Sequence, residues 1–248
     1  MEYLIGFIIA VIIALTGVGA GTITAPMLIL LLHCPAEIAV GTALGYSSAV
    51  RLIIAPVQIL RKQVNYRVFA FMLMGGGPGV LLGSLLFRHV APNTKAMYWV
   101  LGTIIVFSSV MQLVRPLLRK ESSSARPDRL ILLALLMFLI GAEVGLSSSG
   151  AGALGTVAVL SFTSLAAKDV VGTDILFGLA VAVIGSGIHF AFGAYDGALL
   201  TKLIAGGIVG AIVGSVIAPM VPNKILRLGL SVWLLIIGAD FCYRAFRL

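Results

Sequence analysis

Charged residues are scarce in this 248-residue chain: 10% are Asp, Glu, Lys or Arg, and 60% are hydrophobic. With a mean hydropathy of +1.14, the chain has too few polar side chains to cover a water-soluble surface. Apolar stretches lie near 3–33, 36–60, 68–87, 96–114, 130–165, 170–192, 199–221 and 225–241. Most of them reach the roughly 20 residues with which a helix crosses a bilayer. We therefore predict an all-helical (all-α), polytopic membrane protein with about eight membrane segments.

Cysteine is also rare, and sequence motifs that bind metals or nucleotides are missing. Cys34 and Cys242 lie at segment ends without CxxC or other metal-ligand spacing, so we interpret both as structural. Neither an HExxH zinc pattern nor a Walker-type phosphate loop occurs. We predict no metal and no cofactor, and we do not expect this chain to use ATP directly.

A net charge of +8 does not indicate a nucleic-acid partner here, because the basic residues sit at segment ends. Arg61, Lys62 and Arg67 share one loop, and further basic residues mark the linker 119–129. Two predicted spans separate these regions, so both lie on one face, which the positive-inside rule makes cytoplasmic. We expect a multi-pass protein of the cell (inner) membrane, with the lipid bilayer as its surroundings. A homo-oligomer is compatible with this pattern.

The sequence repeats itself at a shift of 131 positions. Gly-Ala-Gly at 19–21 returns at 150–152, and Val-Gly-Thr at 40–42 returns at 171–173. A further set matches at the same shift: Gly75, Gly76, Gly79, Gly83 and Ser84 with Gly206, Gly207, Gly210, Gly214 and Ser215. We predict two membrane repeats, 1–118 and 130–248, joined by the linker 119–129.

The first segment of each repeat is interrupted, by glycines at 17–21 and by a serine-rich run at 147–152. Because glycine weakens a helix interior, we expect two half-helices there, either as a re-entrant hairpin or as a broken span. A hairpin leaves an odd number of crossings and inverts the second repeat, whereas a broken span keeps the repeats parallel. The stronger basic charge of the loop 61–67 favours inversion.

Broken helices at matching places in two repeats point to a transporter's binding site. Free N–H groups at half-helix N-termini attract anions, so we predict that the two tips converge on a small anionic substrate. The alternative is that such glycines only let helices pack closely, which we prefer for Gly75, Gly79 and Gly83. The candidate substrate-binding residues are Gly17, Gly19, Gly21, Thr22, Thr42, Arg51, Ser147, Ser148, Ser149, Gly150, Gly152 and Thr173.

Ionisable residues within membrane segments are costly and suggest function. Arg51 can neutralise an anion, or it can pair with Glu143 or with the carbonyls of a broken helix. Glu143, Asp174 and His189 are candidates for proton coupling. The structural alternatives are a salt-bridge partner for Glu143, a helix cap for Asp174 and a helix–helix hydrogen bond for His189.

The residues that flank these sites carry a family resemblance. They are the glycine-rich break at 17–21 followed by Pro26, the Ala-x-Gly-Thr run at 39–42, and Gly-Ser-Gly-Ile-His ending at His189. The chain resembles the sulfite exporter TauE/SafE family over nearly its whole length. This resemblance implies a carrier of sulfite, sulfonates or related sulfur-containing anions, coupled to the proton gradient. Asp174 departs from the serine or asparagine that commonly follows Gly-Thr in the family, which leaves the precise substrate in doubt.

Two other classes of function compete with a transporter. Ser149 and His189 superficially suggest an intramembrane serine–histidine enzyme, but Ser147 stands where such a motif has glycine. A non-transporting scaffold subunit would not need paired helix breaks. We therefore predict that the chain is not an enzyme, has no catalytic residues, and moves a small anion by alternating access.

Overall fold

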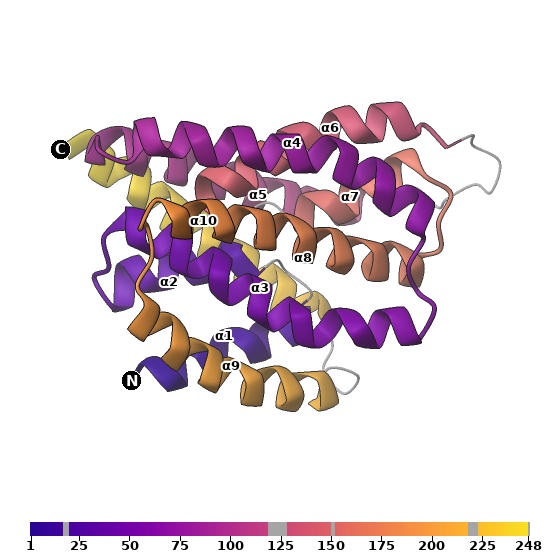
Figure 1. The fold of residues 1–248 in the computed structure, drawn as a ribbon, viewed down its shortest axis with the longest axis horizontal. Coiled ribbons are helices and arrows are strands. Elements are labelled where there is room, and N and C mark those ends of the chain that lie inside the picture. The colour runs from indigo at the N-terminus through magenta and orange to yellow at the C-terminus, as the bar shows by residue number, and fades with distance from the viewer. Residues whose placement is uncertain (17–19, 119–127, 150–151, 218–222, 248) are drawn as a thin grey trace.

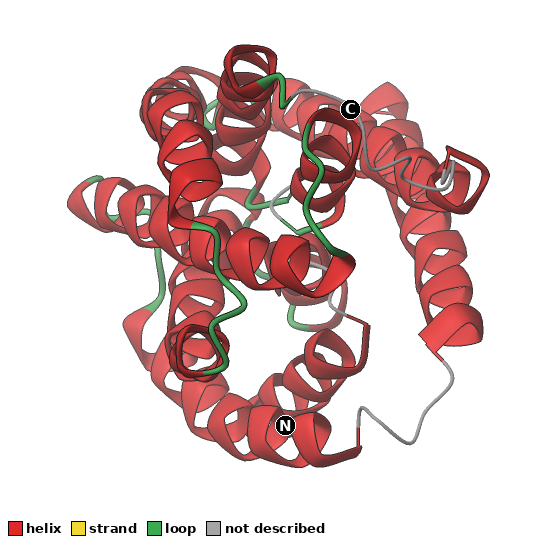
Figure 2. Cartoon of the chain, turned by 90° about the vertical axis from the view of Figure 1, so that its right-hand side faces the viewer, coloured by secondary structure: helices red, strands yellow, loops and turns green. Residues whose placement is uncertain are grey.

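The structure is a computed structural model that describes residues 1–16, 20–118, 128–149, 152–217 and 223–247. These residues form helices and short connections, and none of them lies in a strand (Figure 2). The helices are α1 Glu2–Thr16, α2 Ala20–Leu31, α3 Ala36–Leu60, α4 Tyr66–Val90, α5 Thr94–Leu118, α6 Leu130–Ser147, α7 Ala153–Phe162, α8 Ala167–Ala191, α9 Gly197–Ile217 and α10 Asn223–Arg247. The predicted all-helical fold is confirmed.

Seven helices in the described ranges are long and apolar enough to cross a membrane: α3, α4, α5, α6, α8, α9 and α10. The helices α1, α2 and α7 are shorter, with 15, 12 and 10 residues. At 1.5 Å per residue, α7 extends about 15 Å, half of a roughly 30 Å hydrocarbon core. The short helices α1, α2 and α7 fit the expected half-helices, whereas α6, with 18 residues, is longer than a half-helix.

The α6–α7 segment is a hairpin, because its two outer ends meet. The Arg129 N–H, at the start of α6, donates to the carbonyl of Phe162, at the end of α7, over 2.9 Å. Beside it, the Ser164 N–H donates to the Asp128 carboxylate over 2.9 Å. Both arms thus begin and end at one face, and this is the arrangement for which an inverted second repeat was expected. The repeat and its inversion across a membrane remain predictions.

The helices of the two halves pack against each other rather than only among themselves. In Figure 1, α1 lies beside α9, α3 beside α8, and α4 beside α6, and the contacts between these helices are among the most extensive in the molecule. The α5 and α10 helices form a fourth pair, which touches the remaining helices much less than the α3–α8 pair does. Each pair therefore joins one helix from residues 1–118 to one from 130–248.

Loop contacts show that α3 and α8 run in opposite directions. The Asp196 N–H, beyond the end of α8, donates to Thr42 Oγ1 near the start of α3 over 3.0 Å. At the other end, the Asn65 N–H, beyond the end of α3, donates to Thr173 Oγ1 near the start of α8 over 2.9 Å. Thr173 follows Thr42 by 131 positions, and Asp196 follows Asn65 by 131 positions. The two hydrogen bonds are therefore equivalent under the shift that relates the two halves of the sequence.

Glycine faces bring the paired helices into backbone contact. A methyl group at Gly75, Gly79 or Gly83 of α4 would overlap backbone carbonyls of α6, and one at Gly206 or Gly210 of α9 would overlap carbonyls of α1. Helices without side chains at the contact approach closely and gain van der Waals packing, as membrane helices do. The interpretation of Gly75, Gly79 and Gly83 as packing residues is confirmed.

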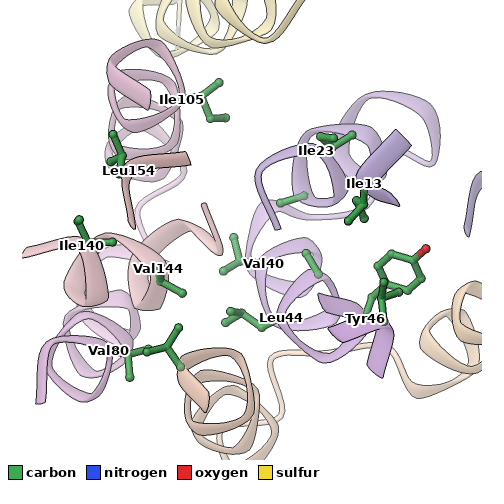
Figure 3. Packing of buried hydrophobic residues seen from close by; sticks show 14 of the residues in the cluster. Ile13, Ile23, Val40, Leu44, Tyr46, Val80, Ile105, Ile140, Val144 and Leu154 are labelled. Carbon is green, nitrogen blue, oxygen red and sulfur yellow. The ribbon is translucent and has the colours of Figure 1, made fainter. Parts of the chain in front are cut away.

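Apolar side chains fill the centre between the pairs. Val40 and Leu44 of α3 face Val80 of α4 and Val144 of α6 (Figure 3), and all four are buried. Their packing fixes α3 against the α4–α6 pair and so holds the end of α6, where the helix breaks, at a defined place in the core.

Candidate functional site

The end of α6 and the start of α2, which flank the two helix breaks, meet in the interior. Ser148, in the left-handed conformation at φ 60°, ends α6, and its Oγ donates to the Gly21 carbonyl over 3.2 Å. Next to it, Ser149 Oγ donates to Thr22 Oγ1 over 3.4 Å. The structure therefore brings Ser148 and Ser149 against Gly21 and Thr22, while Gly17, Gly19 and Gly150 lie outside the described residues.

The hydroxyls at this junction are buried and bonded within it. Ser147, Ser148 and Ser149 are each at most 5% exposed, and Thr22 is 2% exposed. The Ser149 N–H donates to Ser147 Oγ over 3.1 Å, and Ser147 Oγ donates to the Glu143 carbonyl over 3.0 Å. Polar groups buried in an apolar bundle need hydrogen-bond partners. Here these hydroxyl and backbone groups at the end of α6 bond to one another.

A cation and an anion lie beside the junction. Arg51 of α3 is 7% exposed and Asp174 of α8 is 4% exposed, and they are close enough for a direct charge–charge interaction. The Arg51 guanidinium lies against the backbone at Gly178, one helical turn beyond Asp174, where a methyl group would overlap it. Arg51 was predicted to pair with Glu143 as one structural alternative, and the charge beside it is instead Asp174.

Besides its interaction with Arg51, Asp174 contacts the first turn of α7. Thr156 Oγ1 lies 2.9 Å from Asp174 Oδ2 as a hydrogen-bond donor and 2.5 Å from the Gly152 carbonyl. A methyl group at Gly155 would overlap the Asp174 carboxylate. The absence of a side chain at Gly155 thus lets the carboxylate approach the turn that begins at Gly152, whose φ of 113° suits glycine.

Thr42 and Thr173 hold the connections between helices. Each accepts the loop hydrogen bond described above, and Thr173 Oγ1 also donates to the Asp169 carbonyl over 2.6 Å. The loop residues in turn cap the next helices, since Asn65 Oδ1 accepts from the Val68 N–H and Asp196 Oδ1 accepts from Leu199. Both threonines therefore hold a loop against a neighbouring helix. Their contact with substrate stays a prediction.

His189 lies at the junction of α4, α6 and α8. Its ring is fully buried, packs on Phe87 with centroids 4.4 Å apart, and places Nε2 3.0 Å from the Gly145 carbonyl. Nδ1 has no partner among the described residues. The helix–helix hydrogen bond expected as the structural alternative is therefore present, and proton coupling by this ring stays a prediction.

Glu143 faces a different part of the bundle. Its Oε1 accepts a hydrogen bond of 2.6 Å from Ser108 Oγ of α5, and its side chain lines a cavity between α5, α6 and α7. It does not share the place of Arg51 and Asp174. The three candidates for proton coupling, Glu143, Asp174 and His189, thus occupy three separate surroundings.

The rival serine–histidine arrangement is not formed. Ser149 Oγ is bonded to Thr22, and the His189 Nε2 is bonded to the Gly145 carbonyl. In the described residues, three or more His, Cys, Asp or Glu side chains do not gather in a group that could hold a metal ion.

Sequence reasoning missed two polar residues of this region. Thr156 and Ser108 carry the hydrogen bonds to Asp174 and Glu143, yet neither has a polar counterpart 131 positions away, where Ala25 and Ala239 stand. A search for small polar residues one helical turn after a break would have found Thr156, which lies four residues beyond Gly152.

Comparison with known proteins places the chain in a family. The model of the family described as "Sulfite exporter TauE/SafE" matches residues 3–241. The chain is 28% identical over 249 residues to "Probable membrane transporter protein YjnA" of Bacillus subtilis (strain 168), covering 95% of this chain and 96% of that protein. It is 23% identical over 232 residues to "Probable membrane transporter protein YdhB" of the same organism, covering 90% and 92%. No solved structure matches the chain.

These relatives are named as transporters and not as enzymes, in agreement with a multi-pass helical chain whose two helix breaks meet in the interior. Since the family model spans nearly the whole length, including both breaks, the protein belongs to the sulfite exporter TauE/SafE family of membrane transporters.

Proposed function

We propose that the protein is a secondary transporter of small sulfur-containing anions, such as sulfite or an organosulfonate, and that it is coupled to protons. The observation that carries this proposal is the buried Arg51–Asp174 pair set against the first turn of α7, beside the joined helix breaks. A permanent cation in an apolar bundle is costly unless it serves binding or pairing. Its partner Asp174 lies against the N-terminal turn of α7, and a helix N-terminus also favours negative charge.

Backbone N–H groups, hydroxyl groups and the Arg51 guanidinium would together bind the anion. The N–H groups at the start of α7 lack partners within the helix, and together with the helix dipole they form a site for an oxyanion. Hydroxyls of Thr22 and Ser149 add hydrogen-bond donors to an oxyanion's several acceptors. The planar guanidinium of Arg51 can hold two oxygens of a sulfite or sulfonate group at once.

Proton coupling follows from competition for Arg51. While Asp174 is ionised, its carboxylate neutralises Arg51 and an incoming anion meets a site without net charge. When Asp174 takes up a proton, Arg51 keeps its charge and pairs with the substrate instead. One proton and one monoanion then move together, and the site remains neutral in each state. Glu143 and His189 are the alternative proton sites, and the variants below distinguish the three.

Alternating access requires that the site face each side of the membrane in turn. The α6–α7 hairpin and the antiparallel α3 and α8 helices support an inverted repeat, in which the two halves exchange conformations. We propose that the end carrying Arg61, Lys62 and Arg67 faces the cytoplasm of the cell. At the opposite end, Arg244 is paired with Asp240 over 2.7 Å, so this basic residue is locally neutralised.

The experiment is uptake of labelled sulfite into vesicles that contain the purified protein. We expect Arg51→Ala to lower flux by about tenfold or more, the consequence of losing an interaction worth about 1.4 kcal/mol or more. Arg244→Ala, which removes an exposed arginine far from the breaks in the chain, is the matched control and should keep its flux. Equal flux in Arg51→Ala and Arg244→Ala would overturn the proposed site.

Coupling is tested in the same vesicles with an imposed pH gradient. The parent protein should accumulate sulfite with the gradient, and Asp174→Asn should allow only flux that is indifferent to it. If Asp174→Asn stays coupled while Glu143→Gln or His189→Gln loses coupling, the proton site is the altered residue. Thermal unfolding with sulfite, sulfate, thiosulfate and small sulfonates identifies the substrate, since a bound anion stabilises the folded state by RT ln(1 + [L]/Kd).

A further inference from the structure

The cavity that Glu143 lines, between α5, α6 and α7, lies outside the candidate anion site. Its volume is about 520 Å³, within the range of sites that hold drug-sized molecules. The walls are apolar, formed by residues such as Phe107 and Met111 of α5, Leu139 of α6, and Val157 and Phe162 of α7. Hydrocarbon is thus the chemistry that this cavity accommodates.

The cavity opens on the side of the bundle that faces lipid. Phe107 is 55% exposed and Leu139 is 63% exposed, and both lie on helices long and apolar enough to span a membrane. Figure 1 shows α5, α6 and α7 together along the part of the bundle away from α1 and α9. A molecule dissolved in the bilayer can therefore reach this cavity sideways, without passing through water.

One carboxyl group interrupts the apolar lining. Glu143 lies thirteen residues into α6, so it sits about 20 Å along the helix from its membrane-surface end. Oε1 accepts from Ser108, while Oε2 has no hydrogen bond among the described residues. A half-buried carboxyl group that lines an apolar cavity, with one oxygen open to a further hydrogen bond, gains free energy from a ligand that supplies a partner.

We propose that this cavity is a binding site for lipophilic amines that enter from the bilayer, with Glu143 as the anchoring group. An amine crosses the hydrocarbon in its neutral form, and its nitrogen lone pair takes the proton of the Glu143 carboxyl group. The resulting ammonium and carboxylate form an ion pair while the alkyl chain fills the apolar cavity. The amine enters the cavity as a neutral molecule, and the proton transfer to its nitrogen releases no atom from the site. This proposal does not depend on which anion the protein carries.

The test uses dicyclohexylcarbodiimide, an apolar reagent that reacts with carboxyl groups in apolar surroundings. The carboxyl proton moves to one nitrogen of the reagent while the carboxyl oxygen bonds to the central carbon, so the whole reagent is added and its mass stays on the residue. Protein reconstituted in vesicles is labelled, digested and analysed by mass spectrometry. We expect the adduct on Glu143 and none on Asp174, which is enclosed by Gly155 and Thr156.

Dimethyldecylamine is the ligand probe, and decane is its control without a nitrogen. At about ten times its Kd, the amine should slow labelling of Glu143 about tenfold by mass action, and decane should leave the rate unchanged. The proposal is overturned if Glu143 is not labelled in the folded protein, or if decane protects it as well as the amine does.

A pair of variants on one helix checks the place of entry. Leu139→Trp fills the mouth of the cavity and should slow labelling by about tenfold. Leu135→Trp puts the same side chain at an equally exposed position of α6 that does not line the cavity, and labelling should continue at the parent rate. Both residues are largely exposed, so both variants should fold, and equal labelling of the two would contradict entry from the bilayer. Because labelling requires no flux, failure here leaves the proposed transport function untouched, and the reverse holds.

Discussion

Ser148 donates a hydrogen bond from its hydroxyl to the carbonyl of Gly21, although the two residues are 127 positions apart in the chain. This bond joins the break after α6 to the first turn of α2. Gly21 has no side chain, and the Ser148 carbonyl fills the place that a methyl group would take. The end of α6 and the first turn of α2 therefore form a single structural unit, and a change at either one should affect both.

Gly21→Ala should lower the stability of the folded protein, because the added methyl group overlaps a backbone carbonyl that cannot rotate away. Overpacking of this kind costs about 1–3 kcal/mol. The control is Gly187→Ala in α8, where nothing lies within 4 Å of an added methyl group. Thermal unfolding of both variants in the same lipid or detergent is the measurement, and equal melting temperatures would show that the two breaks do not meet as described.

Thr42→Val and Thr173→Val should destabilise the protein by similar amounts. Each change removes the acceptor of one loop N–H, that of Asp196 or of Asn65, and leaves the donor without a partner at a cost of about 1–3 kcal/mol. Thr201→Val is the control, because that exposed hydroxyl bonds only to a carbonyl of its own helix. A large effect of one threonine and none of the other would contradict the equivalence of the two loops.

The Arg51–Asp174 pair should show strong coupling in a double-mutant cycle. Asp174→Asn leaves a buried cation without its anion, and Arg51→Gln leaves the anion, so each single change should cost about 3–5 kcal/mol. The double variant removes both charges and should be less destabilised than the sum of the two single changes. Denaturant unfolding of the four proteins gives the coupling, and strict additivity would mean that the two charges do not interact.

Cys34, in the connection between α2 and α3, should react slowly with maleimide at neutral pH. Burial, and then the nearby Asp196 carboxylate, raise the pKa of its thiol, and the thiolate is the reactive form. Labelling should therefore accelerate as pH rises toward that pKa. Asp196→Asn removes the negative charge, lowers the thiol pKa and should speed labelling at pH 7, while asparagine can still cap α9.

The same thiol reports the orientation of the chain, with Cys242→Ala as the background. Cys34 lies at the end of α3 opposite the loop 61–65, so an impermeant maleimide should reach it from outside intact cells at alkaline pH. In a background without Cys34, the variant Lys62→Cys should react only after the cells are opened. Labelling in the reverse pattern would show that the basic loop faces outward.

The sequence predicts the helices and their interruptions well, because long apolar runs and glycine- or serine-rich breaks depend on local composition. Convergence of the breaks was also predicted, and the Ser148–Gly21 and Ser149–Thr22 contacts agree with it. Whether a break makes a hairpin or a bent span does not depend on local composition. The contacts of Arg129 with Phe162 and of Asp128 with Ser164, at the outer ends of α6 and α7, decide it for the second half.

The partners of buried charges were harder to predict than the charges themselves. Arg51, Asp174 and Glu143 are conspicuous in apolar runs, but which of them meet depends on how each helix is rotated. Glu143 shares a face of α6 with Leu136, Leu139 and Ile140, and that face turns toward α5 and α7. This rotation separates Glu143 from Arg51, and it follows from the glycines of α4 that draw the opposite face of α6 inward.

The pairing of α4 with α6 and of α1 with α9 has a consequence for biosynthesis. The glycine face of α4 emerges from the ribosome long before α6 exists, and α1 must wait longer still for α9. Until then, α1 and α4 lack the partner helices against which they pack in the folded protein. During translation, the helices of the first half thus expose packing faces that become buried only when the helices of the second half are inserted.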